Sequence, residues 1–156
     1  MKIFLGTPIT GIIDETSVSH ISNHNYKALT RIMSDLRGLG HDIFCALEDE
    51  KYGAQIADSD SCTLRDFTRM KACDVYVVFP NESYGCAVEL GWASALSKPI
   101  YIGINKKIGT KSPLYDGLST INATVKIMEY ESDCAFPVDD IWEEILDSIN
   151  VFLETI

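Results

Sequence analysis

A single carboxylate interrupts an otherwise uncharged segment of the chain. The twelve residues 85–96, GCAVELGWASAL, carry one charge, that of Glu89. Ser83 is a suitable N-cap, so Glu89 falls one to two turns into a predicted helix. Apolar neighbours would raise the pKa of this carboxyl, whereas the helix N-terminus favours its anion, and such opposing influences are common at catalytic carboxylates. The simpler alternative is a solvent-facing glutamate, but a solvent-facing helix normally carries further charges.

The elements that must position Glu89 alternate between strands and helices. Apolar runs predict strands over 2–5, 41–47, 74–80, 99–104 and 124–130. Apolar residues at helical spacing predict helices over 26–36, 64–71, 85–96 and 138–153. This order predicts a single α/β domain over residues 1–156, a flavodoxin-like (Rossmann-like) three-layer sandwich with a five-stranded parallel sheet. Ligands of such sheets bind at the C-terminal ends of the strands, here beside the loops 6–23, 48–61, 80–85 and 105–117.

Composition narrows the possible partners. The 156 residues are 46% hydrophobic, which suffices for one core, and their net charge is -10. This charge argues against nucleic acid or a membrane surface as a partner, but it allows a small phosphorylated ligand. The five cysteines form no CxxC pair and the chain has no long apolar run, so we expect a cytoplasmic protein. His20 and His24 lack a third ligand nearby, and we expect neither a metal nor an organic cofactor.

Residues 74–104, DVYVVFPNESYGCAVELGWASALSKPIYIGI, resemble the core of the nucleoside 2-deoxyribosyltransferase-like superfamily. The shared pattern is an acidic start to an apolar strand, then S/D-x-G-x-x-x-E-L-G-x-A, then a lysine-proline strand. The first strand and its loop, IFLGTPITG, fit as well. The resemblance implies that Glu89 attacks the anomeric carbon of a nucleoside or nucleotide and that Asp66 assists the departing base. It also implies a substrate pocket formed by Gly6, Thr7, Pro8, Thr10, Ser83 and Gly85.

Two serines favour the nucleotide-hydrolysing branch of this superfamily. Transferases often carry aspartate where this chain has Ser83, and a serine hydroxyl can donate to a phosphate oxygen. Ser119, in GLSTINA, matches a second serine that the glycosidases take from a neighbouring subunit, which implies a homodimer or larger assembly. One departure weakens the phosphate interpretation, because the loop over residues 6–24 contains no arginine. A phosphate would then depend on the serines, on threonines of that loop, and on His24 or Lys27.

The sequence therefore predicts an enzyme that cleaves the N-glycosidic bond of a nucleoside 5'-monophosphate and releases free base and sugar phosphate. Three alternatives stay open. The first is a nucleoside deoxyribosyltransferase that exchanges bases. The second is a TIR-like NAD glycohydrolase, because SYGCAVEL also resembles the glutamate segment of TIR domains. The third is a nucleotide-binding sensor without turnover.

Overall fold

The computed structural model describes residues 1–9, 12–13, 20–108 and 112–156 of the chain. Its single sheet has five parallel strands in the order β2-β1-β3-β4-β5. These strands are β1 (Lys2–Gly6), β2 (Asp42–Phe44), β3 (Val75–Val78), β4 (Ile100–Asn105) and β5 (Val125–Tyr130). The order is that of flavodoxin-like folds, with the topological switch point between β1 and β3. The predicted fold class is confirmed.

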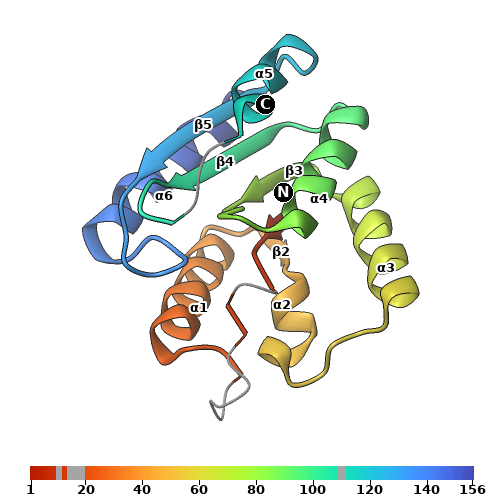
Figure 1. Cartoon of the computed structure of the whole chain (residues 1–156). Coiled ribbons are helices and arrows are strands. Elements are labelled where there is room, and N and C mark those ends of the chain that lie inside the picture. The colour runs from red at the N-terminus through yellow and green to blue at the C-terminus, as the bar shows by residue number, and fades with distance from the viewer. Residues whose placement is uncertain (10–11, 14–19, 109–111) are drawn as a thin grey trace.

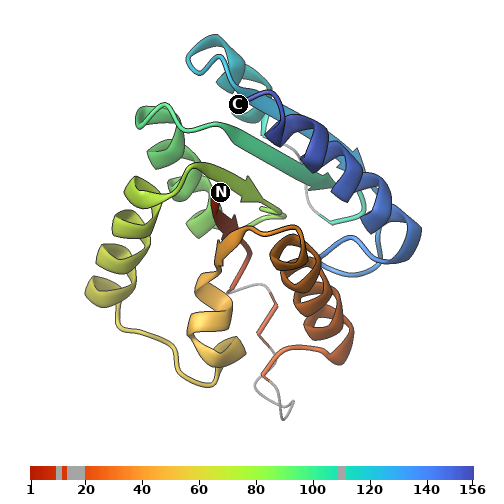
Figure 2. The same ribbon diagram turned by 180° about the vertical axis from the view of Figure 1, so that it is seen from behind.

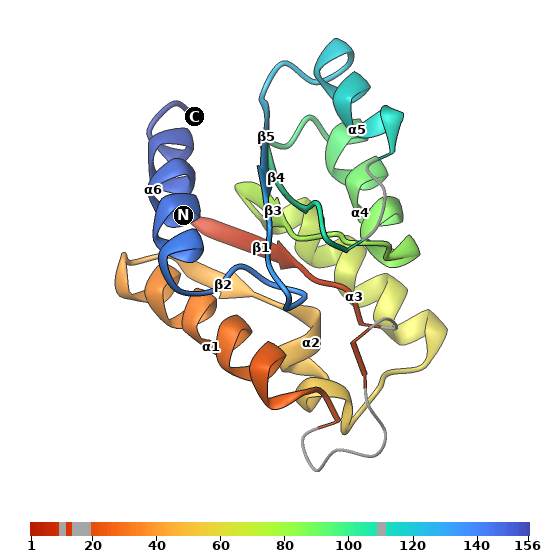
Figure 3. The same cartoon turned by 60° about the vertical axis from the view of Figure 1, so that its left-hand side comes forward.

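Helices cover both faces of this sheet (Figures 1 and 3). One face carries α1 (Asn23–Gly38) and α6 (Asp139–Leu153), which lie toward the viewer in Figure 2. The opposite face carries α3 (Ser59–Ala72), α4 (Tyr84–Ala95) and the short α5 (Pro113–Gly117). The remaining short elements are α2 (Ala46–Asp49) and the 3-10 turns η1 (Lys51–Gly53) and η2 (Leu118–Thr120).

Strand alternation divides the apolar side chains into two buried clusters. Ile3 and Leu5 of β1 point toward α1 and α6, whereas Phe4 between them points toward α3 and α4. The central strand β3 is fully buried, as expected for a parallel strand covered on both faces. Helix α1 begins where the Ser22 hydroxyl accepts a hydrogen bond from the Asn25 amide. Each helix therefore presents one apolar stripe to its own side of the sheet.

A buried asparagine organises the loops at the C-terminal edge of the sheet. Asn105 ends β4, is 1% exposed, and donates through Nδ2 to the carbonyls of Ser132 and Cys134 at 2.8 and 2.9 Å. Its Oδ1 accepts from the amides of Lys107 and Ser132. The side chain of Asn81, just after β3, donates to the Ala135 carbonyl at 3.0 Å. These bonds hold the segment after β5 beside the ends of β3 and β4.

The structure corrects two predicted boundaries. The second strand was expected over 41–47, but β2 ends at Phe44, and Ala46 and Leu47 already belong to α2. The expected irregular loop over 48–61 contains η1 and the first turn of α3, because Asp58 caps that helix by accepting from the amides of Asp60 and Ser61. The polar residues that cap and begin α3 have the composition typical of a loop, which is why the sequence predicted one here.

The fourth expected loop, 105–117, is helical in its last residues, because Ser112 caps α5 and Pro113 fits the first helical turn. At the opposite edge of the sheet, Asp74 accepts a hydrogen bond from the Lys2 amide at 2.7 Å. That contact joins the start of β1 to the residue that precedes β3. Every helix in the described ranges is too short or too polar to span a bilayer.

Candidate active site

Glu89 lies on the sixth residue of α4 and turns inward against the sheet rather than to solvent. Its side chain is half-buried, and its Oε2 accepts a hydrogen bond of 2.5 Å from the hydroxyl of Tyr76 on β3. A short O–H···O⁻ bond of this kind is strong and fixes the direction of the carboxylate. The prediction that Glu89 is partly desolvated near the start of α4 is therefore confirmed in its geometry.

Tyr76 reaches Glu89 only because Gly6 has no side chain. In the sheet Tyr76 pairs with Phe4, and its ring packs edge-on against the Phe4 ring with centroids 5.3 Å apart. From there the ring extends along β1 over Gly6, where an added Cβ would lie 2.7 Å from two ring carbons. Real Cβ atoms do not come that close to another atom, so a larger residue here would displace the phenol. Gly6, predicted to line the substrate pocket, instead leaves room for Tyr76.

Burial raises the pKa of Glu89 from 4.5 to about 7. The hydrogen bond from Tyr76 acts in the opposite direction, the negative charge of Asp66 raises the pKa further, and the positive charge of Arg65 lowers it. Burial and the adjacent Glu89 charge also hold the pKa of Tyr76 well above its ordinary value, so Tyr76 stays a donor. A carboxyl with a pKa of about 7 can exchange its proton near neutral pH.

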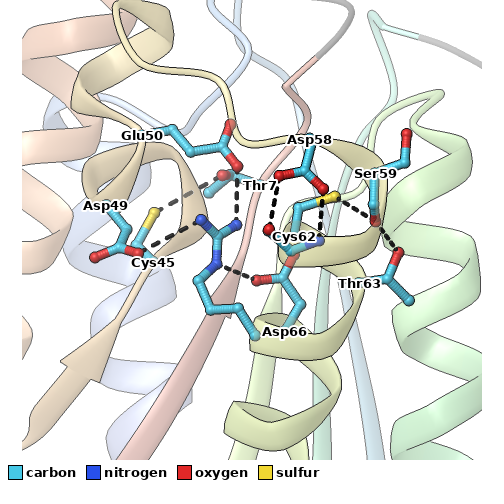
Figure 4. Close-up of polar contacts among 11 residues, drawn as sticks. Thr7, Cys45, Asp49, Glu50, Asp58, Ser59, Cys62, Thr63 and Asp66 are labelled. Carbon is cyan, nitrogen blue, oxygen red and sulfur yellow. Dashed lines mark hydrogen bonds and ion pairs between the residues drawn. The ribbon is translucent and has the colours of Figure 1, made fainter.

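Asp66 lies on α3, close enough to Glu89 for its charge to act on that carboxyl. Its Oδ1 accepts a 2.8 Å hydrogen bond from Nε of Arg65. The same guanidinium contacts Glu50 at 2.9 Å and Asp49 at 3.4 Å (Figure 4). Glu50 is almost fully buried, so one arginine joins the end of α2 to α3. The two predicted catalytic residues, Glu89 and Asp66, thus lie on the neighbouring helices α4 and α3.

The predicted substrate-binding residues around the first turn of α4 lie close in sequence but differ in environment. Ser83 is the N-cap of α4, and its Oγ accepts from the Cys86 amide at 3.3 Å. Gly85 is exposed, and a Cβ there would meet only Ser83 Oγ, at 3.6 Å. Gly85 therefore leaves open space beside the first turn of α4.

Two further predicted residues follow β1. Thr7 is buried, with its hydroxyl 3.8 Å from the Cys45 sulfur, and these two side chains face each other in Figure 4. Pro8 is buried as well and lines the pocket described next. Thr10 lies outside the described residues.

An open pocket of about 1250 Å³ lies at the C-terminal edge of the sheet. Pro8, Asn81, Ser83 and Gly85 line it, together with residues of α1, of the segment after β5 and of α6. Glu89, Asp66 and Thr7 are not among its lining residues. The first turn of α4 therefore belongs to the pocket, and Glu89 follows on the same helix at the inner side.

The pocket wall carries charges of both signs. Its basic side chains are those of His24, Lys27, Arg31 and Lys107. Arg31 is paired with Asp35 and Glu143, and Lys107 contacts Asp133 at 2.8 Å. Within the described residues, Lys27 and His24 have no ion pair.

Ser119, the remaining predicted residue, is exposed in η2, and its hydroxyl donates to the Asp116 carbonyl at 3.3 Å. It does not line the pocket within this subunit. Sequence reasoning missed Tyr76, Arg65 and Glu50. In the sequence, Tyr76 is one more residue of the apolar run 74–80, and Glu50 lies in the predicted loop 48–61. A tyrosine within an otherwise aliphatic strand, next to a strand that ends in glycine, was the available signal.

Comparison with known proteins agrees with this geometry. A family model of the nucleoside 2-deoxyribosyltransferases matches residues 19–118. The solution structure of BlsM is 28% identical with a TM-score of 0.69, over 84% of this chain and 81% of that one. The CMP N-glycosidase BcmB from Clostridium botulinum is 21% identical with a TM-score of 0.67, over 95% and 99%. The 2-deoxyribosyltransferase from Bacillus psychrosaccharolyticus is 20% identical with a TM-score of 0.55, over 93% and 90%. A search of individually curated proteins finds no match.

The family match indicates an enzyme that acts on the glycosidic bond of nucleosides or nucleotides, either as a glycosidase or as a deoxyribosyltransferase. The chain belongs to the nucleoside 2-deoxyribosyltransferase family, whose model covers most of its length. The superfamily predicted from the segment 74–104 is thereby confirmed.

The raised pKa of Glu89 has a consequence for stability. Between pH 4.5 and about 7 the folded state binds more protons at Glu89 than the unfolded state, so this group makes the protein less stable as pH rises. A glutamine at this position carries no charge and can still accept from Tyr76. We expect Glu89→Gln to match the wild type near pH 4 and to exceed its unfolding free energy above pH 7 by on the order of 2 kcal/mol.

Urea unfolding of both proteins between pH 4 and 8 measures this difference. Glu82→Gln, which removes an exposed carboxylate seven residues earlier, serves as the control and should leave the pH dependence unchanged. A stability gap between wild type and Glu89→Gln that is constant across pH would contradict the assignment of a raised pKa to Glu89.

Proposed function

We propose that this protein hydrolyses the N-glycosidic bond of a nucleoside 5'-monophosphate, with Glu89 as the nucleophile. One observation carries the proposal. The half-buried carboxylate of Glu89 is held by Tyr76, and Glu89 lies on the helix whose first turn lines the large pocket. Family membership supplies the class of bond, and the position of Glu89 supplies the reacting group. BcmB, described as a CMP N-glycosidase, supports the hydrolytic branch as a structural neighbour.

The reaction uses the two oxygens of Glu89 differently. Oε2 is occupied by the Tyr76 hydroxyl, and within the described residues Oε1 receives no hydrogen bond. Oε1 attacks the anomeric carbon, the bond from that carbon to the base nitrogen breaks, and its electron pair leaves with the base. Asp66 accepts a hydrogen bond from the base and orients it. Water then attacks the anomeric carbon of the glycosyl ester: its hydroxyl group completes the sugar phosphate, the ester bond breaks and restores the Glu89 carboxylate, and the remaining proton of the water neutralises the departed base.

The start of α4 supports a phosphate in the pocket. Its free backbone amides carry partial positive charge, and Ser83, the N-cap, has a hydroxyl that can donate to a phosphate oxygen. Lys27 and His24 line the same pocket and have no ion pair within the described residues. These two side chains take the place of the arginine that the loop over residues 6–24 lacks.

The outer face of α4 supports a second subunit. Helix α4 is apolar on nearly all sides, and a helix of this composition normally packs on both faces. Tyr84 is 90% exposed and Val88 51% exposed on that helix, and Leu114 and Ile121 are exposed near α5. A dimer across this face would cover these side chains and bring the partner's Ser119 loop toward the neighbouring site.

Base release tests the reaction. We expect the wild type to liberate free base from one or more nucleoside 5'-monophosphates and to act far more slowly on the matching nucleosides. Glu89→Gln should lower kcat by about 10³-fold or more, because the nucleophile is lost while the uncharged isostere keeps the fold. Chromatography of each nucleoside, its monophosphate and NAD, with and without a second base, measures both.

The other outcomes of this assay are informative. Exchange that requires a second base would establish the transferase and contradict hydrolysis, and nicotinamide release from NAD would indicate TIR-like chemistry. Binding without turnover would identify a sensor and remove the catalytic role from Glu89. Glu82 is an exposed glutamate next to the N-cap, and Glu82→Gln controls for the loss of a negative charge at the start of α4.

Ser83 should decide between nucleotides and nucleosides. Ser83→Asp keeps a side chain that can cap α4 but places a negative charge where the phosphate would bind. We expect KM for monophosphates to rise at least about tenfold while activity on nucleosides is kept. Ser112→Asp, the same change at the N-cap of α5, is the matched control. Equal loss on both substrate classes would argue against a phosphate at Ser83.

The proposed dimer predicts complementation between inactive variants. Val88→Glu should dissociate the assembly, because a charge would be buried in an apolar interface, and sedimentation should then detect monomers. Mixing Glu89→Gln with Ser119→Ala should restore activity, since one of the mixed sites contains both wild-type residues. A monomeric wild type, or a mixture without recovery, would contradict the shared site.

A further inference from the structure

We propose that Arg65 is a positioning residue for the Glu89–Asp66 pair: its guanidinium, anchored on the buried Glu50, fixes Asp66 and sets the charge that Glu89 faces. The inference rests on the proposed function, since it assigns Arg65 to the same reaction. Arg65 itself acts through other side chains and contacts no reacting atom.

Figure 4 labels the three carboxylates that anchor Arg65, namely Asp49 and Glu50 at the end of α2 and Asp66 on α3. One terminal nitrogen contacts Glu50 at 2.9 Å, the other contacts Asp49 at 3.4 Å, and Nε contacts Asp66 at 2.8 Å. The Arg65 side chain is 20% exposed, that of Asp66 13% and that of Glu50 4%. An arginine held by three carboxylates at low exposure has a single orientation, because its rigid fork satisfies them in one geometry.

This geometry leaves one oxygen of Asp66 for a ligand. Oδ1 is occupied by Arg65, and within the described residues Oδ2 receives no hydrogen bond. A carboxylate fixed in this way accepts hydrogen bonds and does not donate them. The arrangement therefore suits a departing base that presents an N–H donor, such as an exocyclic amino group, toward Asp66.

Arg65 also acts on Glu89 through its charge. The groups that face Glu89 are Tyr76 from β3, Cys86 from its own helix, and Asp66 and Arg65 from α3. Among these four, only Arg65 carries positive charge, and it lowers the pKa of Glu89 while Asp66 raises it. Without Arg65, no positive charge would balance the effect of Asp66 on Glu89. The pKa of Glu89 would then rise, and its carboxylate would form only at a higher pH.

Arg69 provides a matched comparison one turn later on α3. Both guanidiniums lie over the Phe44 ring, at 5.9 Å for Arg65 and 5.1 Å for Arg69. Arg69 makes no ion pair within the described residues and does not act on Glu89. The two arginines therefore share a helix and a ring contact but differ in the carboxylate network.

The experiment measures the titration of Glu89 directly and the pH dependence of kcat/KM alongside it. The full-length protein is labelled with ¹³C at glutamate carboxyl groups, and Glu89→Gln assigns the resonance. We expect Arg65→Gln to raise the Glu89 midpoint by roughly half a pH unit or more, and to lower plateau kcat/KM about tenfold. Arg65→Lys keeps the charge but not the fork, so the midpoint should stay while plateau kcat/KM still falls. Arg69→Gln should change neither.

The double variant Glu50→Gln with Arg65→Gln removes the buried pair together, so that no unpaired charge unfolds the protein. It should raise the midpoint as Arg65→Gln does. An unmoved midpoint in the double variant, or an equal shift in Arg69→Gln, would overturn the inference. If the wild-type protein releases no base, the proposed function is overturned instead. The effect of Arg65 on the Glu89 midpoint is measured by NMR and does not depend on turnover.

Discussion

The hydrogen bond between Tyr76 and Glu89 is the interaction on which the site depends. A carboxylate turned against the sheet loses hydration, and without a strong donor it would either swing out to solvent or take up a proton. The phenol supplies that donor at 2.5 Å and remains protonated because its own pKa is held high. The donor fits only because β1 ends in Gly6, so one backbone position of the neighbouring strand determines the state of the reacting group.

This constraint explains why the chain maintains a polar cluster in its interior. A buried carboxylate destabilises the folded state above its unfolded pKa, so evolution toward stability alone would replace it. The adjoining Arg65–Glu50 pair has the same character, since an apolar pair of similar size would often be as stable. Retaining both makes sense when charge and direction matter for chemistry. The residues that set the pKa and the direction of Glu89 come from β1, β3 and α3.

The sequence predicted the sheet, the inward turn of Glu89 and the helix that carries Asp66, because apolar periodicity and parallel topology determine them. It did not predict the partners of those residues. The Tyr76 contact spans thirteen positions and depends on how far a ring extends over a neighbouring strand. Glu50 belongs to the segment predicted as a loop over 48–61, because its burial depends on the contact with Arg65 of α3 and leaves no pattern in the chain.

The relation between Glu89 and the pocket bears on which substrate the site can accept. Glu89 faces the α3 side of the sheet, whereas the pocket opens beside α1 and the segment after β5, and the two meet at the first turn of α4. This is the switch point between β1 and β3, where flavodoxin-like folds bind ligands. In the proposed reaction, the sugar and base would lie on the Glu89 side, and a 5'-phosphate would extend past Ser83 toward Lys27, both of which line the pocket.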